Sequence, residues 1–331
     1  MKRIAKEAGV SQATVSRVVS GSASVSSEKR RAVTEAVRRL SYVRNKSAAG
    51  LASKHSYLLG LIVPELSNPF FGEIVHQIGM EANHHGYNII ICTSEGDPRN
   101  ERKLLDSLRG RQVEGIMIAG STSDSQVFKT LENINMPAVL FAQEHEGFNS
   151  VCLAHEKGGE LAANHLLDLG YDRFAFVGST DDLKLPGFVR ALRAHNLDLP
   201  PQNILQAGIW GEEVAHKAYE LGLRFFKDRG KLPANAMFAK NDMAAFGILQ
   251  ALQELNLKVP DDVALVGFDN TFISRGTRPS LTSVAQPIEE IGRSTLELLL
   301  SRTEEKEKSK PIQLRLEPRL VVRQSTRGFE I

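Results

Sequence analysis

Cysteine is scarce in this sequence, which has only Cys92 and Cys152 among its 331 residues. The two lie far apart, each in an apolar stretch, so we expect reduced strand residues rather than a disulfide or a metal pair. Long apolar runs are missing as well: YLLGLIVP and YNIIIC are too short to span a bilayer, and no secretion signal is recognisable. These absences indicate a cytoplasmic protein without a membrane partner.

Motifs that carry enzyme chemistry are also missing. The sequence has no GxSxG elbow, HExxH helix, Walker loop, CxxC pair or dinucleotide glycine fingerprint. The adjacent His84 and His85 diverge on a helix and cannot chelate one ion. We therefore expect neither an enzyme nor a bound cofactor or metal.

Positive charge is concentrated at the start of the chain. The first 55 residues contain 12 Lys or Arg and 3 acidic residues, which leaves 29 basic and 36 acidic residues for the rest. A small basic head therefore precedes a larger acidic body. This asymmetry indicates a polyanionic partner for the head, and a solvated basic surface is the alternative.

The head has the pattern of three short helices that share one apolar core. Gly9 separates the first helix from the second, and Ser11 and Ser26 can cap the second and third through their hydroxyls. Such a unit is typical of helix-turn-helix DNA readers, and we place it at residues 1–40. The apolar residues at helical spacing are Ile4, Ala5, Ala8, Val15, Val18, Val19, Val33, Ala36, Val37 and Leu40.

The second helix of this unit carries side chains that suit DNA. Arg17 can bond to guanine and Gln12 to adenine at the base edges. Hydroxyl groups bind phosphate oxygens and position the helix without reading sequence. The predicted phosphate contacts are Ser11, Thr14, Ser16 and Ser26.

The stretch AGVSQATVSRVVSG, residues 8–21, closely resembles the head of the Lac/galactose repressor (LacI/GalR) family. The resemblance implies that Gln12, Ala13 and Arg17 are the base-reading positions, with a methyl contact from Ala13. It also implies a homodimer on a pseudo-palindromic, double-stranded DNA operator, with the two heads in successive major grooves.

A linker at residues 41–56, SYVRNKSAAGLASKHS, follows the head. In the family this segment forms a helix on DNA, and a Leu from each subunit wedges into the minor groove. The matching positions imply minor-groove contacts from Asn45, Ala48 and Leu51, with Leu51 as the wedge. Arg44 stands where the family usually has Pro, which removes rigidity and adds a charge that attracts phosphate. A linker without DNA contact is the alternative.

From Leu58 onward, short apolar runs alternate with amphipathic stretches. Such alternation is typical of βαβ units and parallel sheets, which bind ligands at the carboxyl ends of their strands. Two successive series predict two doubly wound α/β lobes with a cleft between them. The runs are LLGLIVP, YNIIICT, EGIMIAG, AVLFA, RFAFVGS, NAMFAKN and VALVGFD, with helices expected near 69–85, 98–109, 123–134, 156–169, 182–195 and 242–255.

Motifs of the same family recur in order through this body, including SNPFF (67–71), AKNDMAAFGILQAL and RPSLTSVAQPIEEIG. The resemblance implies the fold of periplasmic sugar-binding proteins, in which the chain crosses three times between two lobes. We therefore expect an effector-binding and dimerisation domain at 57–331, with a first lobe at about 57–156 and 287–320 and a second at about 157–286 and 321–331.

The resemblance also implies an effector pocket in the cleft. A polyol ligand needs aromatic rings for its C–H faces and fixed amide or carboxylate groups for its hydroxyls. Lys184 occupies the place of a common ligand-binding Arg and lacks the planar fork of that residue. The implied effector-binding residues are Phe70, Phe71, Lys184, Trp210, Asn241, Asp269 and Gln286.

Several of these residues have a structural alternative. The two phenylalanines can pack in the core, Trp210 can anchor a surface loop and Asp269 can cap a turn. Ala154 stands where the family often has Asp, and Ala142–Gln143 replaces a frequent Asp–Arg pair. A specific sugar therefore does not transfer from the family to this chain.

Together these features predict a cytoplasmic, nucleoid-associated transcription regulator, expected to be a repressor. A sugar or sugar-phosphate effector would change the angle between the lobes, and the hinge would pass this change to the DNA. Two alternatives stay open. One is control by a protein co-regulator, as in the catabolite control regulators that the stretches GFDNT and RPSLTSVAQP and the tail RQST resemble. The other is a sugar-binding module without regulation.

Overall fold

The protein is described by a computed structural model that covers residues 1–19, 24–41, 55–119, 125–133, 136–208, 213–227, 232–304 and 310–326. The chain divides into two compact units, Met1–Ser56 and Tyr57–Ile331. No helix in these described ranges is long and apolar enough to cross a membrane. The predicted hinge contacts Asn45, Ala48 and Leu51, together with Trp210, lie outside the described residues.

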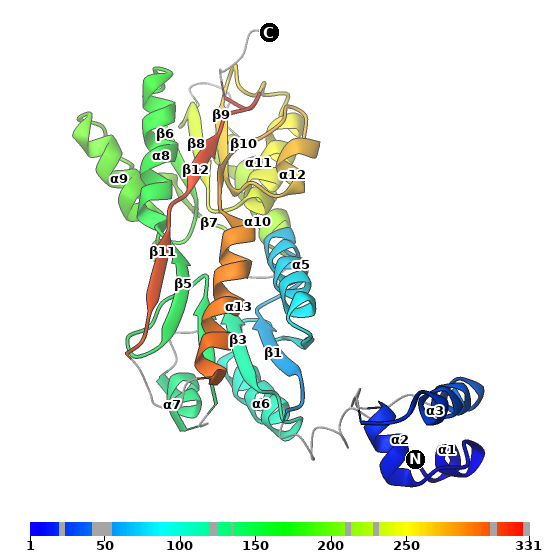
Figure 1. Ribbon diagram of the computed structural model, residues 1–331. Helices are drawn as coiled ribbons and strands as arrows, with labels where there is room; N and C mark the ends of the chain where they lie inside the picture. Colours follow the sequence, from blue (N-terminus) through cyan, green and yellow to red (C-terminus); the bar gives the residue numbers. More distant parts are fainter. Residues whose placement is uncertain are drawn as a thin grey trace. The chain divides into compact units, whose positions relative to one another are not determined.

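The first unit is a head of three helices, α1 (Lys2–Glu7), α2 (Gln12–Val19) and α3 (Ser27–Arg39) (Figure 1). Gly9 separates α1 from α2 with a φ of +62°, a left-handed conformation that favours glycine. The predicted core is confirmed, because the apolar residues of the three helices form one cluster. Its fully or largely buried members are Ile4, Ala5, Val15, Val33 and Ala36.

The two predicted helix caps of the head differ. The Ser11 hydroxyl accepts the Thr14 backbone N–H at 3.2 Å and so caps α2 as expected. Ser26 is the N-cap residue of α3, but its side chain makes no capping bond, so that part of the prediction is wrong. Its exposed hydroxyl is therefore not committed to the helix end.

The first lobe of the body is a six-stranded parallel sheet in the order β2-β1-β3-β4-β5-β11. Helices α5 (Pro69–His84) and α13 (Ile288–Glu304) pack in the core on one face, and α6 (Pro98–Gly110) and α7 (Ser125–Asn133) pack in the core on the other. The strands are β1 (Leu58–Val63), β2 (Asn88–Thr93), β3 (Gly115–Ala119), β4 (Ala138–Phe141), β5 (Asn149–Leu153) and β11 (Gln313–Leu316).

The second lobe repeats this architecture in the order β7-β6-β8-β9-β10-β12, with β12 antiparallel to β10. Helices α8 (His155–Asp168) and α9 (Leu185–Ala194) cover one face, and α10 (Glu213–Phe225) and α11 (Asp242–Glu254) cover the other. A short helix, α12 (Phe272–Gly276), follows β9. The strands are β6 (Phe174–Gly178), β7 (Ile204–Gln206), β8 (Ala236–Ala239), β9 (Ala264–Asp269), β10 (Thr282–Ala285) and β12 (Arg319–Val321).

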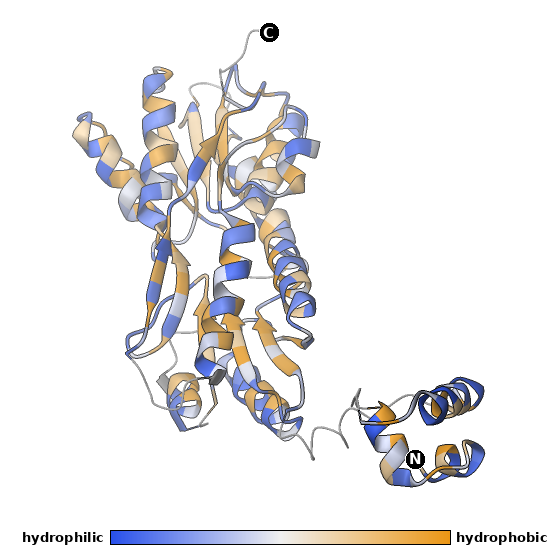
Figure 2. Cartoon of the chain, viewed as in Figure 1, coloured by the Kyte–Doolittle hydropathy of each residue, from blue (hydrophilic) through white to orange (hydrophobic). Residues whose placement is uncertain are grey.

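Most inner strands are apolar along their whole length because helices cover both faces of each sheet. Figure 2 shows β1 and β3 as continuous hydrophobic ribbons, whereas the edge strand β11 carries polar residues. Strand β7 and helix α10 lie between two predicted elements and are not themselves predicted. Strand β12 begins at Arg319 in the second sheet, so the last crossing between lobes precedes the predicted boundary near 320.

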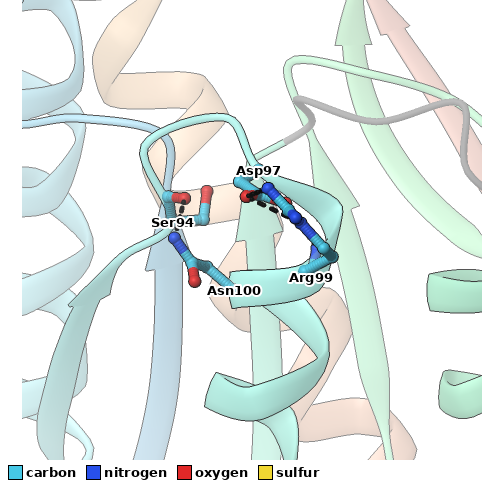
Figure 3. A network of polar contacts seen from close by, with 4 residues as sticks. All are labelled: Ser94, Asp97, Arg99 and Asn100. Carbon is cyan, nitrogen blue, oxygen red and sulfur yellow. Dashed lines mark hydrogen bonds and ion pairs between the residues drawn. The ribbon is translucent and has the colours of Figure 1, made fainter.

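Polar caps start the helices that follow the strands. Asp97 accepts the Arg99 backbone N–H at 2.7 Å and so begins α6 directly before Pro98 (Figure 3). The Arg99 guanidinium bonds both oxygens of the same carboxylate, and the Asn100 amide donates to the Ser94 carbonyl at 3.4 Å. These local bonds terminate β2 and fix the direction of the next helix.

Two glycines let α8 and α9 approach each other closely. A Cβ added at Gly187 would lie 1.8 Å from the Glu156 carbonyl oxygen, and one at Gly159 would lie 2.0 Å from the Lys184 carbonyl oxygen. Each helix therefore rests on the backbone of the other. This contact fixes the position of Lys184, the residue before α9, relative to the start of α8.

A buried carboxylate holds the loop after β9 and strand β10 against α11. Asp242 accepts the Thr271 N–H at 2.7 Å, the Thr271 hydroxyl at 3.0 Å and the Ser283 hydroxyl at 2.6 Å. Burial and the nearby charge of Asp269 raise the pKa of Asp242 to about 7, although these hydrogen bonds act to lower it.

Replacing Gly187 by Ala should lower the melting temperature of the body. The added methyl group would force α8 and α9 apart, and overpacking of this kind destabilises by about 1–3 kcal/mol. Gly110→Ala is the matched control, because nothing lies within 4 Å of a Cβ at this exposed last residue of α6. Equal melting temperatures for the two variants would contradict the close packing.

Asp242→Asn should remove a pH dependence of stability. Between the ordinary Asp pKa of 3.8 and the raised value of about 7, the folded protein holds a proton that the unfolded chain does not. The stability that this proton supplies is fully present below 3.8 and lost as the pH rises through 7. The free energy of unfolding, measured with urea, should fall more for the wild type than for the variant when the pH is raised from about 5 to about 8. A difference that does not change with pH would refute this role.

Candidate DNA-reading helix and effector site

Helix α2 presents its predicted DNA contacts to solvent. Gln12, Ala13 and Arg17 are exposed, whereas Val15 is fully buried in the head core. The exposed side chains therefore lie on a surface that a base edge can approach.

The predicted phosphate contacts of the head are not equivalent. The Ser11 and Thr14 hydroxyls are 2.9 Å apart and bond to each other, while Ser16 and Ser26 are exposed. Basic residues surround them and supply the charge that a phosphate backbone attracts. The exposed basic residues of the head are Lys2, Arg3, Lys6, Arg17, Lys29, Arg31, Arg38 and Arg39.

In the body, four polar residues stand at the carboxyl ends of neighbouring strands of the second sheet. Asp182 follows β6, Lys240 follows β8, Asp269 ends β9 and Gln286 follows β10. Ligands of doubly wound folds bind at this edge of the sheet. The structure thus places the predicted Asp269 and Gln286 on adjacent strands, with Asp182 and Lys240 as residues that the sequence analysis did not name.

Lys184 is held by a partner that the sequence did not reveal. Its Nζ lies 3.1 Å from the Asp182 Oδ1, and the two side chains are 12 % and 7 % exposed. The same Nζ lies 4.7 Å from the centre of the Phe268 ring, which gives a cation–π contact. Burial acts to raise the pKa of Asp182, but the charge and hydrogen bonds of Lys184 outweigh it, so the pKa falls below its ordinary value. The sequence signal for this pair is the acidic residue two positions before Lys184 in TDDLK.

Asp269 is buried in a strained backbone conformation. Its φ is +95°, outside the regions that residues other than glycine normally adopt. Gln286 Nε2 donates to Asp269 Oδ1 at 2.7 Å, while Gln286 Oε1 is buried without a hydrogen-bond partner. Burial raises the pKa of Asp269 to about 6, against the hydrogen bond from Gln286 and the charges of Lys184 and Lys240. Strain and an unpaired oxygen of this kind are typical of functional sites.

Lys240 supplies a second buried cation at this edge. Its Nζ donates to the Gly208 carbonyl at 3.0 Å. Burial and the charge of Lys184 lower the pKa of Lys240, while Asp182 and Asp269 act to raise it. Two lysines therefore lie with two carboxylates at this edge, and the formal charges of these four groups cancel.

Three predicted effector residues have structural roles in this arrangement. Phe70 and Phe71 are 4 % and 3 % exposed and pack in the first-lobe core, with ring centroids 5.1 Å apart. The Asn241 side-chain oxygen accepts the Ala244 N–H at 2.9 Å and caps α11. The two rings thus show the core packing that was their alternative interpretation, and the Asn241 amide oxygen is already used.

The two lobes meet next to Asp269 and Gln286. A cavity of about 470 Å³ opens there and is lined by residues of both lobes, including Glu73 of α5 and Arg319 of β12. The Glu73 carboxylate accepts the Phe272 backbone N–H at 3.2 Å, which joins α5 of the first lobe to α12 of the second. Asp269 and Gln286 therefore border an opening to which both lobes contribute.

Metal chemistry finds no support at this site. Throughout the described ranges, no group of three or more His, Cys, Asp or Glu side chains could hold a metal ion. Cys92 and Cys152 are both unpaired thiols, as expected. The buried polar groups suit a ligand that both donates and accepts hydrogen bonds.

Comparison with known proteins extends over the whole chain. Residues 1–45 match the bacterial regulatory proteins of the lacI family, and residues 163–326 match the periplasmic binding protein-like domain. Catabolite control protein A of Staphylococcus xylosus is 32 % identical over 315 residues, which cover 93 % of each chain.

Two solved structures share the complete architecture. The Lac repressor dimer bound to operator and the anti-inducer ONPF is 26 % identical, covers 98 % of this chain and 97 % of that chain, and gives a TM-score of 0.85. The transcriptional regulator CelR in complex with cellobiose is 28 % identical, covers 98 % of both chains and gives a TM-score of 0.72.

These relatives are transcription regulators and not enzymes, as the sequence predicted. The head and the body occur in this chain in the same order, and the similarity spans nearly its full length. The chain belongs to the LacI family of bacterial regulatory proteins, and it is a DNA-binding transcription regulator.

Proposed function

We propose that this regulator is a dimeric repressor whose affinity for a pseudo-palindromic operator is controlled by a neutral sugar bound between the two lobes. The observation that carries the proposal is the balanced set of buried charges at the strand ends of the second lobe. Lys184 and Lys240 lie there with Asp182 and Asp269, so the formal charges of these four groups cancel and a neutral ligand leaves that balance undisturbed. Sugar hydroxyls donate and accept, and therefore match all four groups.

The relatives support a sugar as the effector but do not identify which sugar it is. CelR is described in complex with cellobiose, and its fold covers nearly all of this chain. The Lac repressor structure is described as a dimer on its operator, which supports a dimeric complex with DNA here. A sugar phosphate, the alternative ligand, would add a negative charge next to the buried carboxylates Asp182 and Asp269.

Control of the head is proposed to pass through the linker. Asn45, Ala48 and Leu51 would contact the minor groove, and a change of lobe angle would alter how a pair of linkers fits it. A ligand shifts such an equilibrium only if it binds one lobe arrangement better than the other. Residues from both lobes around the strand-end site supply that difference.

Arg17→Ala should relax base preference in a selection from random duplex DNA. Loss of a bidentate contact to guanine typically costs about 1–3 kcal/mol of specific binding. Ser26→Ala is the control, because its exposed hydroxyl makes no capping bond and should contribute only to phosphate binding. An unchanged preference in the Arg17 variant would rule out base reading by this residue. DNA binding by a chain truncated to begin at Tyr57 would favour a different DNA surface.

Sugar binding should appear as a rise in the melting temperature of the full chain. Ligand at about 100 times its dissociation constant adds about 2.7 kcal/mol of stability. The panel is D-ribose, D-xylose, D-glucose, cellobiose, gluconate and glucose 6-phosphate, and we expect the shift with a neutral member. Asp269→Asn should abolish it, while Glu297→Gln on the exposed face of α13 should not. A shift with glucose 6-phosphate alone would refute the neutral sugar, and no shift at all would favour a protein co-regulator.

A further inference from the structure

The first residue of α8 holds a buried nitrogen without a partner in the protein. His155 Nδ1 is buried and makes no hydrogen bond. Native structures leave few polar atoms in this state, because burying one unpaired is destabilising. The nitrogen therefore needs an explanation other than the stability of the fold.

His155 lies between the two lobes and next to the strand-end site. Its ring stacks on Phe268, with centroids 6.1 Å apart and an angle of 29° between the planes. Lys184 lies over the same Phe268 ring, so His155 and Lys184 share one aromatic support. The charged groups that act on the imidazole come from both lobes and are Lys184, Asp182, Glu144 and Arg315.

An ion pair within the protein does not explain this histidine. Burial, assisted by the charge of Lys184, lowers the pKa of His155 to about 3, so the ring is neutral near pH 7. Both neighbouring carboxylates already have partners: Glu144 lies 2.6 Å from Arg315, and Asp182 lies 3.1 Å from Lys184. A neutral imidazole offers one donor and one acceptor, which is the pattern that a hydroxyl group matches.

The helix that begins at His155 also lacks a side-chain cap. Ala154 is the N-cap residue of α8 and contributes no hydrogen bond to the first turn. Backbone N–H groups at a helix start have no partner inside the helix, and they favour an electronegative atom. A ligand hydroxyl can donate to the His155 nitrogen and accept from such an N–H at once.

We propose that the start of α8 is a subsite of the effector cleft, in which His155 Nδ1 bonds a hydroxyl of the bound sugar and selects among sugars. This inference rests on the proposed function, because it assumes that a sugar occupies the cleft. His155 would then be a specificity-determining residue of the cleft. It lies where the chain crosses from the first lobe to the second. The subsite would require a hydroxyl within reach of both Lys184 and α8.

Three substitutions at this position separate a ligand contact from a structural role. His155→Leu removes both nitrogens at similar volume, His155→Asn keeps a polar atom near the place of Nδ1, and His155→Gln keeps one near the place of Nε2. Each full-length variant is compared with the wild type by its melting temperature alone and with D-ribose, D-xylose, D-glucose or cellobiose.

We expect the Leu variant to differ from the wild type in two opposite ways, in its melting temperature without sugar and in its affinity for sugar. The Leu variant should melt at or above the wild-type temperature without sugar, because an unpaired buried nitrogen is gone. Its affinity for the sugar that stabilises the wild type should fall by about tenfold or more, as for the loss of one hydrogen bond in a closed site. The Asn variant should retain most of that affinity and the Gln variant should not.

Wild-type affinity in the Leu variant would overturn the subsite while leaving the proposed function intact. A lower melting temperature of the Leu variant without sugar, with Asn and Gln equivalent in sugar binding, would assign His155 to the fold instead. A wild type that responds to none of the four sugars would refute the sugar effector itself, and the subsite would fall with it.

Discussion

Lys184 and Asp182 are buried together at the strand ends of the second lobe, and a charge removed from water is tolerated only while its partner stays in place. Much of the surrounding structure keeps them there. The glycine contacts between α8 and α9 fix the Lys184 backbone, and Phe268 supports its ammonium group. Asp269 and Lys240 stand on the next strands and complete a neutral set.

The same edge of the sheet is where the lobes touch. Glu73 of α5 accepts a backbone N–H of α12, and His155 begins α8 directly after the first lobe's strand β5. Groups from both lobes therefore lie near the same strand ends. A ligand bound there, as proposed, would contact both lobes, and such contacts make its affinity depend on the lobe arrangement. The head has its own small core, formed by apolar residues of its three helices.

The structure shows the local consequences of two positions at which this chain departs from the family's usual residues. Ala154 replaces a frequent Asp and leaves the start of α8 without a side-chain cap. Lys184 replaces a common Arg, and its ammonium group pairs with Asp182 without the planar fork of a guanidinium. Such changes alter the polar groups at the strand ends of the second lobe while the fold stays the same.

Sequence alone determined the helix-turn-helix head, the two α/β lobes and the family, because these follow from local patterns. The spacing of Val15, Val18 and Val19 sets the buried face of α2, and apolar runs between amphipathic stretches set the parallel sheets. Short or edge elements such as β7 and β12 escaped prediction because three residues carry too little periodicity.

The composition of the site was decided only by the tertiary structure. Asp182, Lys240 and His155 lie on separate elements, and nothing in their local sequence shows that they surround one position. Phe70 and Phe71 match the family's motif, yet packing against the first sheet places both rings in the core. Local spacing fixes secondary structure, whereas burial, charge pairing and unpaired polar atoms depend on contacts between residues far apart in the chain, and these exist only once the lobes have folded.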